Sequence, residues 1–292
     1  MSTTRLVLVH GRAQENKDSI ALKAEWIDAY RAGLLKSQLP YALTEERVKF
    51  PYYGQALYDL VRGAATVAEV IVRGVEDRAE QEFQQAVIQE LQQKLYIDDA
   101  EVDAVLDQAV KDRGVLNWEW VQGILQVVDQ KVPGASSASI ALATRDVYHY
   151  LKNPGARDLI ERGVREAMQP GLPTVVVAHS LGTVVAYNLL RREGAARGWH
   201  VPLFVTLGSP LGVEAIRSAL APIEHPSCVG HWFNAMDDGD VVALYPLTPV
   251  RFNIDPPIEN KINVSNRTPN RHGIAGYVGD KEVAARIAQA LL

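Results

Sequence analysis

The fold is decided by a short stretch in the second half of the chain, which reads Thr174-Val175-Val176-Val177-Ala178-His179-Ser180-Leu181-Gly182. Its first five residues form an apolar, β-branched run, which is typical of a strand buried on both faces of a parallel sheet. A helical pattern follows directly over residues 182–192. The stretch therefore predicts a strand that turns into a helix at Ser180, with the small residues Ala178 and Gly182 on either side of the turn.

Strands and helices alternate on both sides of this unit. The other strands are predicted at residues 5–9, 47–50, 203–207, 229–235 and 261–264. Helices are predicted at residues 20–34, 145–168, 182–192, 214–220 and 281–292, and the second of these has a possible break at Pro154-Gly155. The alternation predicts the α/β class, with a mainly parallel, doubly wound sheet of about six strands and helices on both faces.

One long segment interrupts the alternation. Residues 56–145 contain no convincing strand and are predicted to be a helical insertion, while residues 1–55 and 146–292 form the α/β core. A Glu- and Gln-rich helix in the insertion places its apolar residues on one face, namely Phe83, Val87, Leu91 and Leu95. Small residues at 133–139 suggest a linker at the end of the insertion. Two interpretations stay open, because the insertion can be a mere spacer or a lid over the sheet.

Composition and charge exclude several classes of function. A formal net charge of −5 and the absence of a long Lys/Arg run argue against nucleic acid as a partner. The single Cys228 rules out an internal disulfide and a Cys-based zinc cluster, and we expect no metal. No apolar run approaches the roughly 18 residues of a membrane helix, and no signal peptide is recognisable, so we expect a cytoplasmic protein. The oligomeric state is left open.

The turn at Ser180 matches a known catalytic arrangement. Residues 178–182 fit the nucleophile elbow Gly-x-Ser-x-Gly, with Ala178 in the first position. Such a turn lifts the serine hydroxyl above the edge of the sheet and directs the N-terminus of the next helix at the same place. The N–H of Leu181 can then stabilise an oxyanion. The alternative is a serine that merely caps the helix.

Four features in order make the chain resemble the α/β-hydrolase superfamily, in its lipase- and esterase-like branch. The first strand ends in His10-Gly11-Arg12, similar to the oxyanion turn of that family, and the elbow follows. Residues 206–211 resemble its Gly-Ser-Pro turn, and an acidic turn precedes a late histidine. The resemblance implies an activated serine, an acyl-enzyme intermediate and no cofactor. It also implies an oxyanion held by the N–H groups of Leu181 and of Arg12 or Gly11.

The resemblance further implies where the base and the acid lie. The base of the family follows the acid in sequence, and among seven histidines only His272 comes after the acidic turn at residues 237–240. The acid itself has two main candidates. Asp240 ranks first because it precedes Val241-Val242, similar to an Asp-x-Val pattern of the family. Asp237 ranks second because it is the first acidic residue after the strand.

These residues predict the hydrolysis of a carboxylic ester, or a related acyl bond, of a small and apolar acyl substrate. A thioesterase, peptidase or phospholipase would use the same residues, and a binding protein on a hydrolase fold is a further alternative. Four residues are candidates for the substrate pocket. They are His10 and His179 beside the predicted nucleophile, and Trp118 and Trp120 in the helical insertion.

Overall fold

A parallel sheet forms the centre of the molecule. The computed structural model describes residues 4–12, 14, 17–55, 77–106, 118–132, 134 and 136–292 of the chain. Its six strands are β1 (Arg5–Val9), β2 (Val48–Lys49), β3 (Thr174–His179), β4 (Val201–Leu207), β5 (Val229–Ala235) and β6 (Glu259–Lys261). They lie in the order β2-β1-β3-β4-β5-β6, and each neighbouring pair is parallel. The predicted α/β class is therefore confirmed, and the sheet is parallel throughout.

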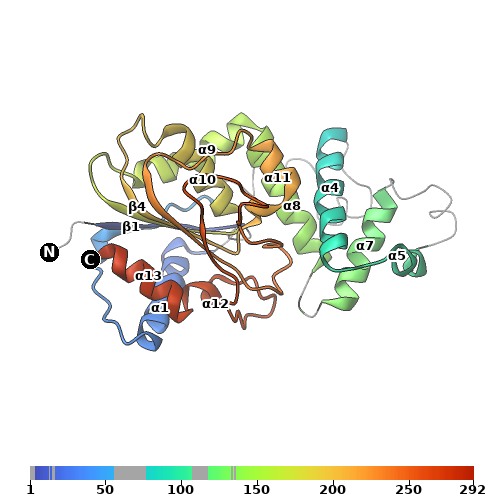
Figure 1. Cartoon of the computed structure of the whole chain (residues 1–292), viewed down its shortest axis with the longest axis horizontal. Helices are drawn as coiled ribbons and strands as arrows, with labels where there is room; N and C mark the ends of the chain where they lie inside the picture. The colour runs from blue at the N-terminus through green and yellow to red at the C-terminus, as the bar shows by residue number, and fades with distance from the viewer. Residues whose placement is uncertain are drawn as a thin grey trace.

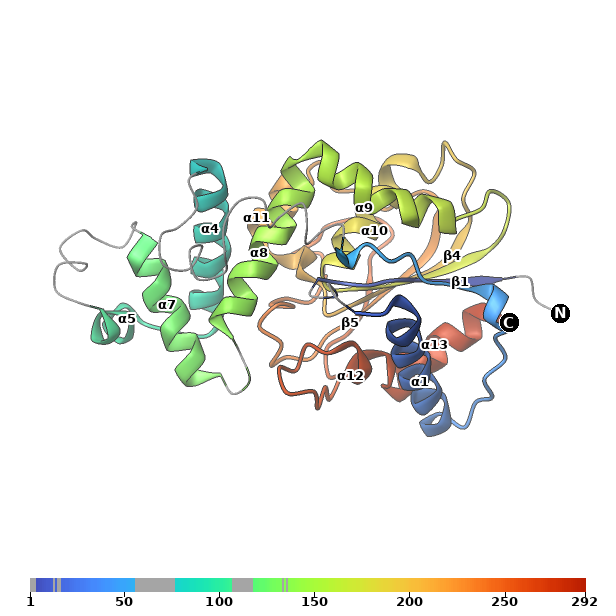
Figure 2. The ribbon, with the colours of Figure 1, turned by 180° about the vertical axis from the view of Figure 1, so that it is seen from behind.

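Helices cover both faces of the sheet, because side chains alternate along each buried strand. Val7 of β1 belongs to the apolar cluster on one face, and Leu8 belongs to the cluster on the other. Figures 1 and 2 show the two layers. One contains α9 (Pro154–Ala167) and α10 (Leu181–Glu193), and the other contains α1 (Ser19–Lys36), α12 (Ile274–Val278) and α13 (Lys281–Leu291). The described part of the core also contains the short helices η1 (Glu45–Arg47), η2 (Pro210–Gly212) and α11 (Glu214–Ala219).

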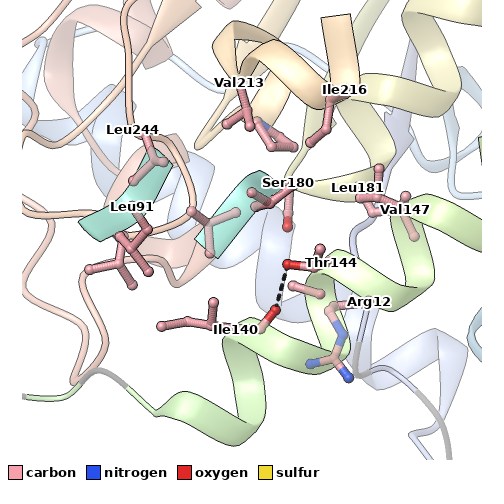
Figure 3. A pocket seen from close by; sticks show the side chains of 15 residues that line it. Arg12, Leu91, Ile140, Thr144, Val147, Ser180, Leu181, Val213, Ile216 and Leu244 are labelled. Atoms are coloured by element: carbon pink, nitrogen blue, oxygen red, sulfur yellow. Dashed lines mark hydrogen bonds between the residues drawn. The ribbon is translucent and has the colours of Figure 1, made fainter. Parts of the chain in front are cut away.

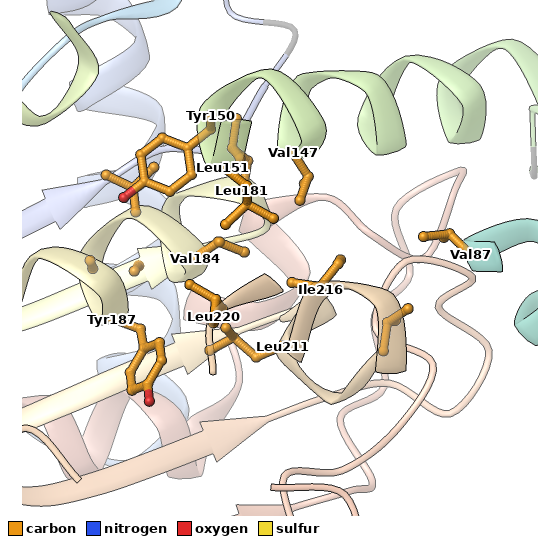
Figure 4. Packing of buried hydrophobic residues seen from close by; sticks show 14 of the residues in the cluster. Val87, Val147, Tyr150, Leu151, Leu181, Val184, Tyr187, Leu211, Ile216 and Leu220 are labelled. Atoms are coloured by element: carbon orange, nitrogen blue, oxygen red, sulfur yellow. The ribbon is translucent and has the colours of Figure 1, made fainter. Parts of the chain in front are cut away.

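The predicted insertion contains helices that lie beyond one end of the sheet (Figure 1). We call α4 (Arg78–Lys94), α5 (Asp99–Val105) and α7 (Trp118–Lys131) the helical block. Helix α8 (Ser137–Lys152) connects this block to the layer that contains α10. In Figure 4 the side chains of Val147 and Leu151 on α8 extend toward Leu181 and Val184 on α10, so the block shares a continuous apolar core with one face of the sheet.

Some predicted boundaries differ from those of the structure. Helix α8 begins at Ser137, well before residue 145, because the side chain of Ser136 caps it by accepting a hydrogen bond from the N–H of Ser139. It thus runs across the predicted boundary between residues 145 and 146, and it ends at the predicted break, where Asn153 caps α9. The last strand, β6, covers Glu259–Lys261 rather than the predicted residues 261–264, so the predicted bounds were wrong. Residues 56–76 and 107–117 of the predicted insertion, and residues 133 and 135 of the linker, lie outside the described residues.

The strand order identifies where a ligand site is expected. The chain runs from β1 to the edge strand β2 and then returns past β1 to β3. The direction of winding therefore reverses between β1 and β3. In open α/β sheets the crevice outside the carboxyl ends of the strands at this switch point is the usual place for a ligand. Strand β1 leads there into His10-Gly11-Arg12, and β3 leads into Ser180.

A buried carboxyl group connects the helical block to α8. Glu80 of α4 is only 4% exposed, and its Oε1 accepts a hydrogen bond from Gln84 Nε2 at 3.2 Å. The Nε of Arg145 lies 3.5 Å from the same oxygen, and the Nε2 of His149 lies 3.5 Å from Oε2. Burial raises the pKa of Glu80 to about 7, although the charge of Arg145 acts in the opposite direction. The carboxyl group is therefore harder to ionise in the folded protein than in the unfolded chain.

This shift predicts a pH-dependent stability. Between pH 4.5 and 7 the unfolded chain ionises Glu80 while the folded protein keeps it protonated, so the free energy of unfolding falls as the pH rises. Glu80→Gln removes this dependence. Relative to wild type, its free energy of unfolding should rise over that window by up to about 3 kcal/mol, since each pKa unit corresponds to roughly 1.4 kcal/mol. Urea titrations at several pH values measure the effect. Glu82→Gln, an exposed site on the same helix, serves as the control, and a difference that is constant with pH would contradict the prediction.

Candidate active site

The turn after β3 holds Ser180 in an unusual backbone conformation. Its φ is 54° and its ψ is −130°, a region that side chains disfavour, and its N–H donates to the carbonyl of Leu207 at 3.0 Å. A Cβ on Gly182 would lie 2.4 Å from the carbonyl oxygen of Val9, so only glycine permits helix and strand to approach this closely. The side chain of Ser180 makes no capping hydrogen bond to α10. The helix-cap interpretation therefore does not describe this serine.

His272 contacts the hydroxyl of Ser180. It lies in the loop before α12, and its Nε2 is 2.8 Å from Ser180 Oγ. Its other ring nitrogen, Nδ1, is 2.7 Å from Asp240 Oδ2. An ionised carboxylate can only accept a hydrogen bond, so Nδ1 carries the proton and Nε2 is left to accept the proton of the serine hydroxyl. The structure thus brings together a hydroxyl, an imidazole and a carboxylate from three separate parts of the chain.

Asp240 is held on both of its carboxylate oxygens. Oδ1 accepts the N–H groups of Val242 at 2.8 Å and of Ala243 at 3.3 Å, and Oδ2 accepts the hydroxyl of Tyr277 at 2.5 Å as well as His272. Burial by itself would raise the pKa of Asp240. The charge of His272 and these hydrogen bonds outweigh burial and hold the pKa below its ordinary value. The side chain is therefore ionised and fixed in position at neutral pH.

Asp237, the second candidate acid, lies elsewhere. Its Oδ2 accepts the N–H of Asn266 at 2.8 Å, and its Oδ1 lies 3.1 Å from Nε of Arg271 and accepts the N–H of Gly239 at 2.8 Å. Both Asn266 and Arg271 belong to the loop that leads to His272. Asp237 therefore anchors the loop of the histidine, whereas Asp240 contacts the imidazole.

Two buried side chains hold the His272–Asp240 pair in place. They are His179, which contacts His272, and Tyr277, which contacts Asp240. The Nε2 of His179 donates to the carbonyl oxygen of His272 at 2.7 Å, and the two rings lie 4.7 Å apart. Burial and the nearby charge of His272 lower the pKa of His179 to about 3, so its ring is neutral. Burial and the charge of Asp240 raise the pKa of Tyr277, which keeps its hydroxyl protonated as a donor. No pattern in the sequence indicates this role for Tyr277.

The turn after β1 lies against Ser180. Gly11 has no room for a side chain, because a Cβ there would lie 2.8 Å from the Cβ of Ser180. His10 is fully buried, and burial lowers its pKa to about 4, so its ring is neutral. Its Nε2 accepts the N–H of Tyr53 at 3.1 Å, which leaves Nδ1 to donate to the carbonyl of Gly11 at 2.6 Å. Since the next peptide bond is trans, the N–H of Arg12 points away from that carbonyl and from the His10 ring.

Helices determine the positions of two further groups at the site, the N–H of Leu181 and the guanidinium of Arg12. Leu181 is the first residue of α10, so its N–H has no partner within the helix ladder and lies at the positive end of the helix dipole. The guanidinium of Arg12 is fixed by Asp146 of α8, with 2.7 Å between Nε and Oδ2. This ion pair connects the turn after β1 directly to the helix that leads into the helical block.

Two cavities meet at Ser180. We call the first the apolar pocket; it lies among α4, α8, α11 and the segment after Asp240 (Figure 3). We call the second the polar groove; its lining includes His179 and His272. Both are lined by Ser180, Arg12, Ile140, Ala143, Val241 and Val242. The serine hydroxyl thus stands where an apolar space joins a polar one.

Three of the four predicted pocket residues do not line these cavities. His179 lines the polar groove, but His10, Trp118 and Trp120 are absent from the described linings of both. His10 is enclosed by aromatic rings, including that of Tyr53 at 4.0 Å. The two tryptophans are buried on α7, which packs against α4, α5 and α8 within the helical block. Instead, Val87 and Leu91 of α4 line the apolar pocket, although the sequence indicated only that they share a helix face.

Comparisons with known proteins add no further identification. A scan against protein-family models, a search of curated proteins and a search of solved structures found no match. Over the described part of the chain, no group of three or more His, Cys, Asp or Glu residues is arranged to hold a metal ion. Likewise, no helix in that part is long and apolar enough to cross a membrane. The function must therefore be argued from the geometry at Ser180.

Proposed function

We propose that this chain is a serine hydrolase that cleaves a carboxylic ester, or a related acyl bond, on an α/β-hydrolase fold with the helical block as its cap. The observation that carries the proposal is the continuous hydrogen-bonded series from Ser180 Oγ through His272 to Asp240, with contacts of 2.8 and 2.7 Å. A general base in contact with the nucleophile, itself oriented by a third group, is the recurring arrangement of covalent hydrolases. Its position at the switch point of the sheet supports the same assignment.

The first chemical step forms an acyl-enzyme. The Oγ of Ser180 attacks the carbonyl carbon, and its proton passes to Nε2 of His272. Asp240 stays ionised, holds the imidazole in the required tautomer and stabilises the imidazolium that forms. The backbone strain at Ser180 and the close approach of Gly182 to β1 support this role, because they hold the hydroxyl in one place before the substrate arrives.

Two backbone N–H groups are assigned to the oxyanion. The N–H of Leu181 at the start of α10 and that of Arg12 in the turn after β1 donate to the carbonyl oxygen of the substrate as it becomes negative. The hydrogen bond from His10 to the Gly11 carbonyl supports this role, because it directs that oxygen away from the site. One oxyanion donor of this kind is worth about 10²- to 10³-fold in kcat.

The acyl-enzyme is then hydrolysed. His272 gives its proton to the departing alcohol, thiol or amine, which leaves with that proton. Water next attacks the acyl carbon of Ser180, and His272 removes a proton from the water. The same two N–H groups hold the second oxyanion until the acid departs and the hydroxyl of Ser180 recovers its proton.

An alkyl fluorophosphonate tests the proposal, because its phosphorus reacts only with an activated serine. We expect one covalent adduct per chain, located at Ser180 by mass spectrometry and absent from Ser180→Ala. Ser209→Ala is the matched control: Ser209 follows the neighbouring strand β4, but its Oγ lies 2.8 Å from the Thr183 hydroxyl, whereas that of Ser180 contacts an imidazole nitrogen. This variant should keep the label. A folded wild-type protein that takes up no probe would refute the assignment.

A further inference from the structure

We infer that the substrate joins an aliphatic acyl group, bound in the apolar pocket, to a polar leaving group, bound in the polar groove. This inference rests on the proposed function and goes beyond it by naming the substrate class. It is carried by the different chemistry of the two cavities that meet at Ser180, and by the side of the serine on which His272 lies.

Beyond its mouth, the described lining of the apolar pocket is almost entirely aliphatic. Its wall consists mainly of apolar side chains from several segments, such as Leu91 on α4, Val147 on α8, Ile216 on α11 and Leu244. Thr144 is the one polar residue of the described lining besides Ser180 and Arg12. Its hydroxyl donates to the carbonyl of Ile140 in the same helix at 2.9 Å, as Figure 3 shows.

The group bound in this pocket must therefore be apolar. Arg12 stands beside Ser180, with its Nε engaged by Asp146. A hydroxyl, amide or charge carried deeper into the pocket would lose its hydration and would find at most the hydroxyl oxygen of Thr144 as a partner in the described lining, which is costly. An alkyl chain has no such cost, and each buried methylene contributes about 0.8 kcal/mol, which corresponds to roughly a fourfold gain in kcat/KM.

The leaving group must occupy the other cavity. His272 protonates the departing atom, so that atom lies next to the imidazole. His272 lines the polar groove and is absent from the described lining of the apolar pocket. The groove also contains Gln14, Lys17, Glu25 and Asn270. These amide and charged side chains can hydrogen-bond a hydroxylated or charged leaving group.

A chain-length series tests the acyl side of the inference. We expect kcat/KM for 4-nitrophenyl esters, from acetate to dodecanoate, to rise about three- to fourfold per methylene until the pocket is full, and then to fall. Leu91→Ala should move the optimum to chains longer by two or three carbons. Ile88→Ala is the matched control, since Ile88 is a fully buried aliphatic residue of the same helix that does not line the pocket.

A second variant keeps the test decisive if Leu91→Ala fails to fold. Val147→Leu narrows the same pocket from α8 and should move the optimum to shorter chains. A flat profile in wild type, or an equal change in Leu91→Ala and Ile88→Ala, would overturn the inference. The assignment of the leaving group to the polar groove is tested with glycerol and benzyl esters of the acyl group that gives the highest kcat/KM. Hydrolysis is measured by the release of acid, and a preference for the benzyl ester would overturn this assignment.

The two proposals fail in different ways. A wild-type protein that takes up the fluorophosphonate at Ser180 but shows no chain-length dependence contradicts only the substrate assignment. A protein that neither takes up the probe nor hydrolyses any ester of the series contradicts the proposed function, and the substrate assignment falls with it.

Discussion

Ser180→Ala is expected to lower kcat by about 10⁴- to 10⁶-fold, the loss seen when the nucleophile of a catalytic triad is removed. The variant keeps His272, Asp240 and both proposed oxyanion donors, so the residual rate reflects binding and electrostatic stabilisation alone. Ester hydrolysis at saturating substrate measures the effect, with the best ester of the chain-length series.

The structural cost of this substitution should be small. The hydroxyl makes one hydrogen bond, to His272, and an alanine has the same backbone preferences as serine at φ 54°. The melting temperature should therefore stay close to that of wild type, which separates a chemical effect from unfolding. Turnover within about tenfold of wild type in pure, folded Ser180→Ala protein would exclude the serine mechanism.

Asp240→Asn is expected to lower kcat by about 10⁴-fold. The asparagine amide can turn its NH₂ group toward Nδ1 of His272, and the ring then carries its proton on Nε2, where it cannot accept the proton of Ser180. The expected readout is a loss in kcat with little change in KM, because the acid contacts the base rather than the substrate.

Asp237→Asn is the matched comparison. The two aspartates lie three residues apart and are both buried, but Asp237 pairs with Arg271 rather than with His272. Losing its charge loosens the loop that carries the base, so we expect a lower melting temperature and a decrease in kcat of only about tenfold or less. If Asp237→Asn loses more activity than Asp240→Asn while both stay folded, the roles assigned to the two residues must be exchanged.

The sequence predicted the sheet well because its strands are short, apolar and β-branched. The apolar run of β3 before Ser180 is typical of a strand buried on both faces. Gly182 after Ser180 indicates a turn in which helix and strand approach closely. The choice between Asp240 and Asp237 was harder. It depends on how the turn after β5 folds back, with Oδ1 of Asp240 bound to backbone N–H groups, and residue types alone do not determine such a path.

Long-range partners account for what the sequence did not predict. Trp118 and Trp120 are both buried on α7, but no sequence pattern indicates that the neighbours of α7 are α4, α5 and α8. Tyr277 looks like an ordinary apolar core residue in its short helix. Its hydroxyl reaches Asp240 only because the loop at His272 places α12 beneath the turn after β5. A spacing rule contains no information about such contacts between distant segments.

The walls of the apolar pocket differ in how freely they can change. Val241 and Val242 line it from the same turn in which the N–H of Val242 holds the carboxylate of Asp240. Val87 and Leu91 line it from α4, which contributes nothing to the hydrogen-bonded series at Ser180. Mutations on α4 could therefore retune which acyl groups are accepted while the chemistry is preserved. If the proposed function holds, a combinatorial library aimed at new substrates should vary α4 and leave the valine pair intact, and natural divergence of this protein would follow the same route.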